Sequence, residues 1–263
     1  MTMGLGQGLT QIFMYQKNEP YYLGDESYET VGYKTNLDSN VALDCFKKMC
    51  EYFSLHGQPV TYDFANRFRT GEMPIGIADY TLYNQLSCFA PEIKGLWEFI
   101  RLPGTPSETE PGKINHTAPT SVNAVMIMND SDKPDNAWKY IKWWVGEEAQ
   151  SRFGKEQVAI LGTAAKYHTA NVKALLAQPW SSQELKNLEQ QFNSLTGTPM
   201  TPGNYILARY TNFAFLDVVD KGESTSEAMY YYIDEINKEL TRKRAEYDFP
   251  TYETLLEEGK IEK

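Results

Sequence analysis

The sequence predicts an α/β protein whose second half is rich in helices. Over the first 153 residues, short apolar runs alternate with amphipathic patterns, as expected where strands alternate with helices. In the last hundred residues, four amphipathic patterns of helical period follow one another. A chain of 263 residues is long enough for one large domain or two small ones.

The clearest helix is expected directly after residues 36–39. Its apolar residues recur at spacings of three and four and form one stripe: Ala42, Cys45, Phe46, Met49, Cys50 and Phe53. Three candidate start residues precede it, Ser39 being the last, and Gly57 ends the pattern. A shorter helix is expected over 63–68, and Gly71 ends it.

Three segments are predicted to be strands. Residues 73–78 form a compact apolar run with Pro74 near its start, where a missing N–H is tolerated. Residues 97–102 and 122–128 are the other two. Between these two lies the clearest linker candidate, residues 103–116, which hold three prolines with glycine, serine and threonine.

The remaining predicted elements are helices. One is expected to begin near Ser131 or Asp132, with Pro134 in its first turn and an apolar stripe that includes Trp138. The other four are expected near residues 170–176, 182–195, 209–219 and 226–247. Gly222 ends the third of these four.

Charge and cysteine content exclude several functions. The net charge of −10 repels nucleic acid and anionic lipid, so neither is an expected partner. The one dense basic run, residues 238–244, is interpreted as a solvated helix face because glutamates lie within and beside it. Cys45 and Cys50 point in different directions on one helix and are not expected to form a disulfide. No histidine lies near them at zinc spacing, and we expect neither a metal nor a cofactor.

Few motifs indicate catalysis. A Gly-rich phosphate loop and a G-x-S-x-G motif are both missing from the sequence. Glu72 and Asp79 bracket the predicted strand 73–78, and paired carboxylates are what a glycosidase uses. A carbohydrate-active enzyme is therefore the alternative function, although we expect no catalytic residues.

A polar and aromatic stretch, Asp79-Tyr80-Thr81-Leu82-Tyr83-Asn84, follows the predicted strand 73–78 directly. In open α/β sheets, ligands bind beyond the carboxyl ends of strands. A carboxylate, two phenols and a carboxamide at this position suit the hydroxyls and flat faces of a sugar. An ordinary loop whose tyrosines pack inward explains the same residues equally well.

The order of several motifs resembles that of family 1 extracellular solute-binding proteins, the maltose-binding-like receptors of ABC importers. Residues 68–77, Phe-Arg-Thr-Gly-Glu-Met-Pro-Ile-Gly-Ile, are similar to the family's helix end and the buried strand after it. The resemblance continues through Pro103-Gly104, the strand 121–128, the helix 134–153 and the helix start 222–229. Residues 90–97 and 167–171 are similar to a subgroup of long receptors from Gram-positive bacteria.

The resemblance implies an architecture and a location. The chain would be the C-terminal, helix-rich portion of a type II periplasmic-binding-protein-like fold, with most of the first lobe absent. Residues 1–106 with 165–263 would form part of one lobe, and residues 107–164 would cross to the other. The first residues lack the pattern of an export signal, so the chain is either cytosolic or part of a longer precursor. The resemblance implies a cell-surface lipoprotein whose lipid anchor lies outside this chain.

The resemblance also implies a function and a site. The protein would bind a carbohydrate, an oligosaccharide, and deliver it to the permease subunits of an ABC importer. Eight residues of this sequence match the family's ligand-facing positions: Asp79, Tyr80, Tyr83, Ser121, Asn123, Tyr205, Arg209 and Tyr210. Arg209 is the leading candidate because a guanidinium can bind two hydroxyls at once. A surface salt bridge of Arg209 with Asp217 or Glu223 is the other interpretation.

Overall fold

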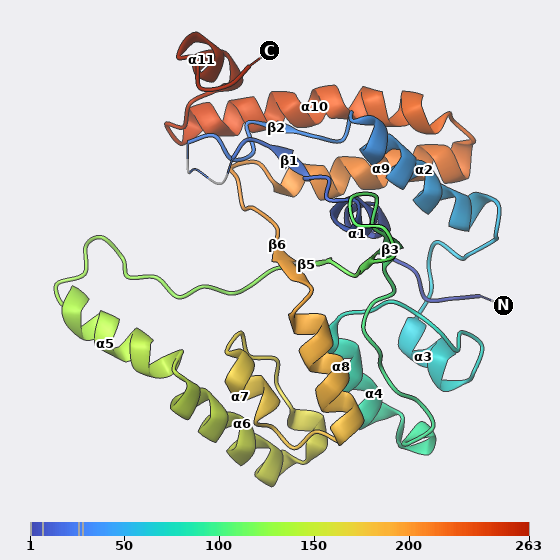
Figure 1. Cartoon of the computed structure of the whole chain (residues 1–263), viewed down its shortest axis with the longest axis vertical. Helices are drawn as coiled ribbons and strands as arrows, with labels where there is room; N and C mark the ends of the chain where they lie inside the picture. Colours follow the sequence, from blue (N-terminus) through green and yellow to red (C-terminus); the bar gives the residue numbers. More distant parts are fainter. Residues whose placement is uncertain (1, 7, 26, 28, 263) are drawn as a thin grey trace.

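The computed structural model describes residues 2–6, 8–25, 27 and 29–262. Most of this described chain is helical, and its strands are only two or three residues long. The elements form two groups, with the short pair β5 (Ala118–Thr120) and β6 (Leu195–Gly197) between them (Figure 1). The upper group contains the first sixty or so residues and the last sixty or so, and the lower group contains the middle of the chain.

Four helices of the upper group, α1, α2, α9 and α10, are called the helical body here. They span Leu9–Gln16, Asn40–Ser54, Tyr205–Lys221 and Thr225–Glu246. Their apolar faces meet in one continuous cluster of buried side chains, the main core of the described chain. This core buries apolar area from helices more than 150 residues apart in sequence, and that burial is its main source of stability.

Helix α2 has the burial pattern expected from the sequence. Its six buried side chains are the six residues of the predicted stripe. Ser39 caps the helix by accepting a hydrogen bond from the backbone N–H of Ala42 at 3.1 Å. At its other end Phe53 packs edge to face on Phe215 of α9, with 4.8 Å between ring centroids. Cys45 and Cys50 are free, as expected.

Helix α10 corrects one interpretation of the sequence. Three cations of the basic run, Lys238, Arg242 and Lys243, form ion pairs with glutamates of the same helix, and of these Lys238 and Arg242 are exposed. Arg244 is instead fully buried. Its guanidinium donates hydrogen bonds to three backbone carbonyl oxygens, including that of Val31 at 2.9 Å. Arg244 therefore faces inward and ties α10 to the loop before β2.

The rest of the upper group consists of short elements. Strand β1 (Tyr22–Leu23) pairs antiparallel with β2 (Lys34–Thr35), with Tyr22 opposite Thr35. The terminal helix α11 (Tyr252–Glu257) follows α10 and lies at its end (Figure 1). Neither α11 nor α1 was predicted from the sequence.

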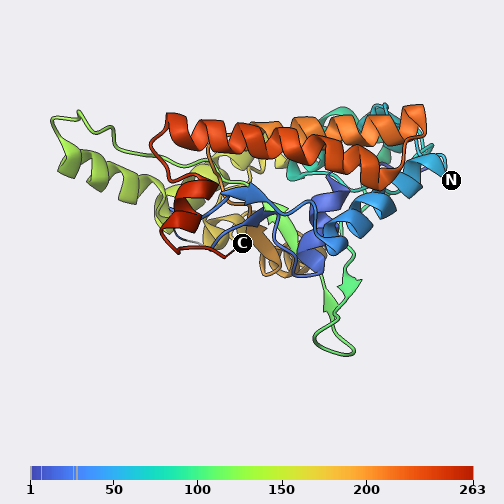
Figure 2. The ribbon, with the colours of Figure 1, turned by 90° about the horizontal axis from the view of Figure 1, so that it is seen from above.

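The lower group is built mainly of helices. They are α3 (Phe64–Arg69), α4 (Tyr80–Phe89), α5 (Pro134–Trp144), α6 (Glu147–Leu161), α7 (Val172–Leu176) and α8 (Ser182–Phe192), with short 3-10 turns at Pro91–Ile93 and Thr163–Ala165. Helix α4 replaces the loop considered in the sequence analysis. Helix α5 and the segment before it extend away from the rest of the molecule in both overall views (Figures 1 and 2).

The three predicted long strands are wrong for the described chain. Residues 97–102 and 122–128 have no strand structure, and the segment 73–78 has a single bridge, between Gly76 and Gly4. Met73 is fully buried, but Ile75 is exposed. A strand forms only where a second strand accepts and donates its hydrogen bonds. Among the described residues, Gly4 alone bonds to 73–78 in this way, and the segments 97–102 and 122–128 have no neighbouring strand.

The proline-rich segment 103–116 forms a hairpin of β3 (Thr105–Pro106) and β4 (Ile114–Asn115), which projects from the molecule (Figure 2). The buried side chain of Gln16 holds its base, by donating to the carbonyl of Pro103 and accepting from the hydroxyl of Thr105. Strand β5 follows and pairs parallel with β6. The predicted division into 1–106 with 165–263 and a separate 107–164 stays a prediction.

Candidate functional site

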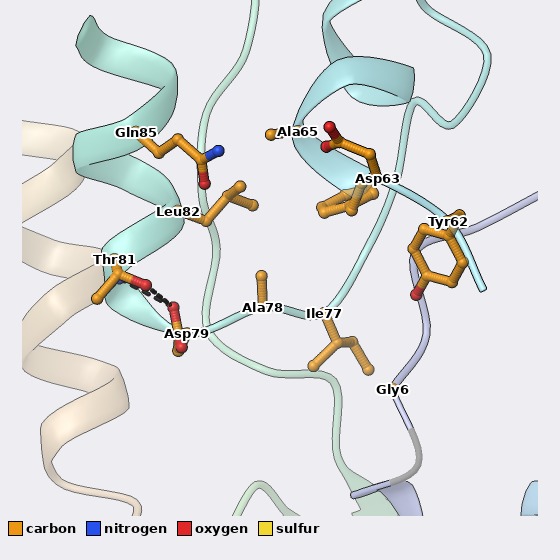
Figure 3. A pocket seen from close by; sticks show the side chains of 11 residues that line it. Gly6, Tyr62, Asp63, Ala65, Ile77, Ala78, Asp79, Thr81, Leu82 and Gln85 are labelled. Carbon is orange, nitrogen blue, oxygen red and sulfur yellow. Dashed lines mark hydrogen bonds between the residues drawn. The ribbon is translucent and has the colours of Figure 1, made fainter. Parts of the chain in front are cut away.

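The site that the described residues build most clearly is an open cavity of about 390 Å³ between α3 and α4. Figure 3 shows the side chains of both helices facing each other across it. Tyr62 and Asp63 come from the start of α3, Asp79 precedes α4, and Leu82 and Gln85 come from α4 itself. The cavity thus carries two carboxylates, a carboxamide and a phenol ring.

The two carboxylates hold equivalent local positions. Asp63 accepts a hydrogen bond from the backbone N–H of Asn66 at 3.0 Å, and Asp79 accepts one from that of Thr81 at 3.0 Å. Each is therefore the N-cap of its helix. These bonds use Oδ1 of each carboxylate, which leaves Oδ2 able to accept a hydrogen bond from a bound hydroxyl.

Two glycines lie next to residues that line the cavity, beside Phe64 and Ile77. Gly4 and Gly76 form the single β-bridge there, and the backbone N–H of Gly4 donates to the carbonyl of Ile75 at 2.9 Å. A Cβ at either glycine would lie within 2.3 Å of the Phe64 ring. Only glycine therefore lets this backbone pass beneath Phe64, and the pattern of small residues at 4 and 76 follows from that contact.

Tyr80 and Tyr83 lie on the opposite face of α4 from Leu82 and Gln85. They belong to an aromatic cluster made of Tyr80, Tyr83, Trp97, Phe99 and Trp180. Burial raises the pKa of both phenols, with smaller contributions from neighbouring acidic groups. Both tyrosines thus pack in this aromatic cluster, behind the cavity wall.

A buried lysine lies against this aromatic cluster. The side chain of Lys166 is only 3% exposed, and its Nζ lies 4.1 Å from the centroid of the Trp180 ring. Nζ also donates to the Tyr83 hydroxyl at 3.1 Å, and that hydroxyl donates to Oε1 of Glu184 at 2.9 Å. The backbone carbonyl of Lys166 accepts from Asn84 at 2.8 Å. Lys166 therefore joins α4 and α8.

The charges in this network shift one another's pKa. Burial lowers the pKa of Lys166, and the nearby Glu184 carboxylate opposes that shift. Burial raises the pKa of Glu184, but the hydrogen bonds from Ser181 and Tyr83, together with the charge of Lys166, outweigh burial and leave this pKa below its ordinary value. The hydrogen bonds to Glu184 and the nearby lysine therefore favour the charged form of its carboxylate, whereas burial disfavours the charged form of Lys166.

The predicted residues of α9 lie away from the cavity and do not line it. The Tyr205 hydroxyl donates to the carboxylate of Glu239 on α10. Tyr210 stacks at a tilt on Tyr232, with 5.5 Å between the ring centroids, at the edge of the helical body. Arg209 is exposed, and Asp217, one of its two proposed salt-bridge partners, pairs with Lys221 at 2.6 Å instead.

The other predicted residues are dispersed. Ser121 and Asn123 are exposed in the extended segment after β5. The Glu72 carboxylate, proposed as a catalytic partner of Asp79, pairs with Arg67 at 2.9 Å and does not line the cavity. Of the eight predicted site residues, only Asp79 lines this cavity. Among the described residues no cluster of histidine, cysteine and carboxylate side chains could hold a metal ion.

Most of the residues that line the cavity were not predicted from the sequence as site residues. Asp63 was predicted as a helix start but not as a site residue, and its position matches that of Asp79. That equivalence, an aspartate directly before each of two helices, is the one feature of the sequence that could have indicated it. Lys166 and Trp180 follow no local pattern, because their contacts with Tyr83 join residues more than 80 apart in the chain.

Comparison with solved structures identifies the fold. The chain is similar to the sugar-binding protein MalE from Xanthomonas citri, with a TM-score of 0.67 and 14% identity over 94% of this chain and 60% of that one. It is also similar to an ABC transporter solute-binding protein from Thermotoga lettingae bound with α-D-tagatose, with a TM-score of 0.61 and 13% identity over 91% and 60%. A cyclo/maltodextrin-binding protein complexed with maltotetraose gives a TM-score of 0.60 at 13% identity, over 90% and 59%.

The likeness shows the fold. The expected class, a helix-rich portion of a type II periplasmic-binding-protein-like α/β fold, is confirmed. The chain spans about three fifths of the length of these solved proteins. No protein-family model matches the sequence, and no curated protein matches it.

Proposed function

We propose that the chain is the C-terminal part of an extracellular receptor that binds an oligosaccharide and delivers it to the permease subunits of an ABC importer. The observation that carries this proposal is the fold, which it has in common with several proteins that are described as binding sugars or were solved with a sugar bound. The motif order along the sequence supports it independently.

The described cavity supplies a suitable wall for such a solute. Sugars present hydroxyls around an apolar ring face, and Asp63 and Asp79 offer carboxylate oxygens to those hydroxyls beside the Tyr62 ring. The aromatic cluster and Lys166 stiffen α4 from behind, so Tyr80 and Tyr83 act by holding the wall in place.

The remaining predicted residues would supply further contacts in the proposed cleft. Arg209, Tyr205 and Tyr210 would contribute from α9, and Ser121 and Asn123 from the segment that crosses between lobes. In this proposal the site closes by hinge motion, with 1–106 and 165–263 on one side and 107–164 on the other.

The location follows from the same proposal. The receptor would be a cell-surface lipoprotein whose lipid anchor lies outside these 263 residues. Within the described ranges, no helix has the length and apolar character needed to cross a membrane.

Calorimetry tests the proposal directly. The full-length receptor that contains this chain is titrated with α- and β-linked oligosaccharides, from disaccharides to hexasaccharides, and the sugars are then analysed for cleavage. We expect saturable binding with every sugar recovered intact. Cleavage would favour the alternative, a carbohydrate-active enzyme, and no binding across the whole panel would remove the proposed function.

Matched variants locate the site. Asp79→Asn keeps a side chain that can cap α4 but removes the charge, and Asp63→Asn does the same for α3. A hydrogen bond to a charged group is worth about 1.5–3 kcal/mol, so each variant should weaken binding by about tenfold or more. Asp44→Asn removes an exposed carboxylate on α2 and should leave the affinity unchanged. Equal affinities in all three variants would place the site elsewhere.

A further inference from the structure

The hollow between α3 and α4 continues past the cavity described above. A second, smaller hollow of about 280 Å³ adjoins the cavity, and Asp63, Ala65 and Gln85 line both. Figure 3 shows Ala65 and Gln85 on the side of the cavity away from Gly6. Because Ala65 carries only a methyl group, little side chain separates the two hollows at this point. The second hollow is called the second chamber here, and its other lining residues are Asn66, Arg69, Leu86, Phe89 and Ala90.

The cavity and the second chamber lie along one face of α4. Leu82 lines the cavity, Gln85 lines both, and Phe89 lines the second chamber. Spacings of three and four residues place these side chains on the same side of a helix. The helix rises about 10 Å from Leu82 to Phe89. The two hollows together are therefore longer than a single sugar ring.

The far end of the second chamber combines an apolar floor with an exposed aromatic ring. Leu86 and Ala90 line the chamber and are themselves buried, so they form its floor. The side chain of Phe89 is 76% exposed and lies at the last position of α4. A flat apolar ring of this kind, with polar groups close by, suits the apolar face of a sugar.

Arg69 provides fixed hydrogen-bond donors in the same chamber. Its Nη2 donates to Oδ1 of Asn66 at 2.9 Å, and its Nη1 donates to Oε1 of Glu92 at 3.2 Å. These bonds use two of the five N–H groups of a guanidinium, so the others can donate to a bound hydroxyl. Because two acceptors hold the guanidinium in place, binding a hydroxyl orders it little further. Gln85 adds a carboxamide, which can both donate and accept.

The charges around the second chamber favour an uncharged occupant. The Glu92 carboxylate pairs with Arg69 and offsets its positive charge. Asp63 places another carboxylate where the cavity and the second chamber meet. An acidic sugar in the chamber would bring a third negative charge close to these two carboxylates, and like charges repel. A neutral sugar ring avoids this repulsion.

We propose that the second chamber is a subsite for a further, uncharged sugar ring, and that the solute is a neutral oligosaccharide whose chain runs along α4 towards Phe89. One ring lies in the cavity beside Asp79, and the next ring stacks on Phe89. Gln85 and Arg69 donate to the hydroxyls of that second ring. This inference rests on the proposed function and adds to it the charge of the solute and the direction in which its chain extends.

Calorimetry with a graded series of sugars tests the inference. The full-length receptor that contains this chain is titrated with glucose, galactose and mannose and with their α-1,4-linked and β-1,4-linked oligomers of two, three and four rings. The affinity should rise by about tenfold or more at the step where the added ring reaches the second chamber, because that ring gains a stacked face and a hydrogen bond to a charged group. The step should disappear when the added ring is a uronic acid.

Matched variants assign this step to the second chamber. Phe89→Ala removes the ring and should reduce the step to less than about threefold, whereas Phe89→Tyr retains a ring and should retain the step. Asp79→Asn should weaken binding of every sugar in the series by a similar factor and preserve the step. Leu55→Ala removes an apolar side chain of similar exposure, 72%, at the end of α2 and should change neither the affinities nor the step.

Two results would overturn the inference while leaving the proposed function intact. One is a parent that binds these sugars without a step, or with a step that Phe89→Ala retains. The other is a step of equal size when the added ring is acidic. A parent that binds no sugar of the series would overturn the proposed function, and this inference with it.

Discussion

The helical body and the segment 121–128 contain similar apolar residues, yet only the helical body buries them. Helix α2 buries all six residues of its stripe, while Val122 and Met126 are among the most exposed apolar side chains described. The difference lies in where the hydrogen bonds are made. A helix satisfies its backbone within itself and then needs only an apolar face to pack on, whereas a strand needs a neighbour for its backbone as well.

The largest predicted effect is a contrast in stability between these two regions. Phe215→Ala removes a fully buried ring that packs on Phe53, and it should lower the free energy of unfolding by about 3–5 kcal/mol. Met126→Ala should change it by less than about 0.5 kcal/mol, because the side chain is exposed. Urea unfolding followed by circular dichroism measures both. Similar losses of unfolding free energy in the two variants would show that the side chains of 121–128 are packed in solution and not exposed.

The same contrast explains how much of the fold the sequence could predict. The helices α2, α3, α5, α7, α8, α9 and α10 were predicted within a few residues. The terminal residues Ser39, Asp63 and Gly222 were predicted as well, because each acts within a few residues of its own helix. The segments 73–78, 97–102 and 122–128 have the composition of strands, but composition does not reveal whether a partner strand is present. Arg244 was predicted to lie on a solvated face. Its partners are three backbone carbonyls outside α10, and such partners leave no local pattern in the sequence.

The candidate site was less predictable than the fold. Asp79 was identified because it follows an apolar run, and its role as an N-cap of α4 was missed because the stretch was taken as a loop. The positions of Tyr80 and Tyr83 depend on which face of α4 meets α8, and that is decided by Lys166 and Trp180 far along the chain. The spacing of residues along α4 does not indicate which of its faces contacts α8.

A second prediction concerns Lys166, which joins the helices of the lower group where few apolar residues do so. Lys166→Ala empties the space beside Trp180 and removes a donor to Tyr83, so it should lower the free energy of unfolding by about 2 kcal/mol. Lys166→Met fills much of the same volume without a charge to bury, and it should cost about 1 kcal/mol or less. Thermal unfolding of the two variants measures both losses of stability. Equal losses in Lys166→Met and Lys166→Ala would show that the charge and its hydrogen bond, and not the packing, hold α4 to α8.

A third prediction uses the pH dependence of the same network. The pKa of Glu184 lies below its ordinary value of 4.5, so its carboxylate binds fewer protons in the folded protein than in the unfolded one. Its contribution to stability is therefore complete above pH 4.5 and is lost as the pH falls through the lowered pKa. Glu184→Gln should lose about 1 kcal/mol at pH 7, and its stability should then fall less steeply below pH 4.5. Glu189→Gln changes an exposed carboxylate on the same helix and should reproduce the parent's acid profile. Parallel acid limbs in the Glu184 variant and the parent would rule this contribution out.

The smallest predicted change in stability is that of Arg209→Ala. The proposed role of Arg209 is to bind the solute. Its side chain is exposed on α9, so Arg209→Ala should alter the free energy of unfolding by less than about 0.5 kcal/mol. A guanidinium that binds sugar hydroxyls is worth about 1.5–3 kcal/mol, so the same variant should weaken oligosaccharide binding by about tenfold or more. Arg152→Ala removes an equal charge from an exposed ion pair on α6 and is the matched control.

Calorimetry of both variants beside Asp79→Asn then shows which residues contact the solute. A loss in Asp79→Asn alone confines binding to the cavity between α3 and α4, a loss in Arg209→Ala alone transfers it to α9, and losses in both mean that the two groups of the molecule close on one solute.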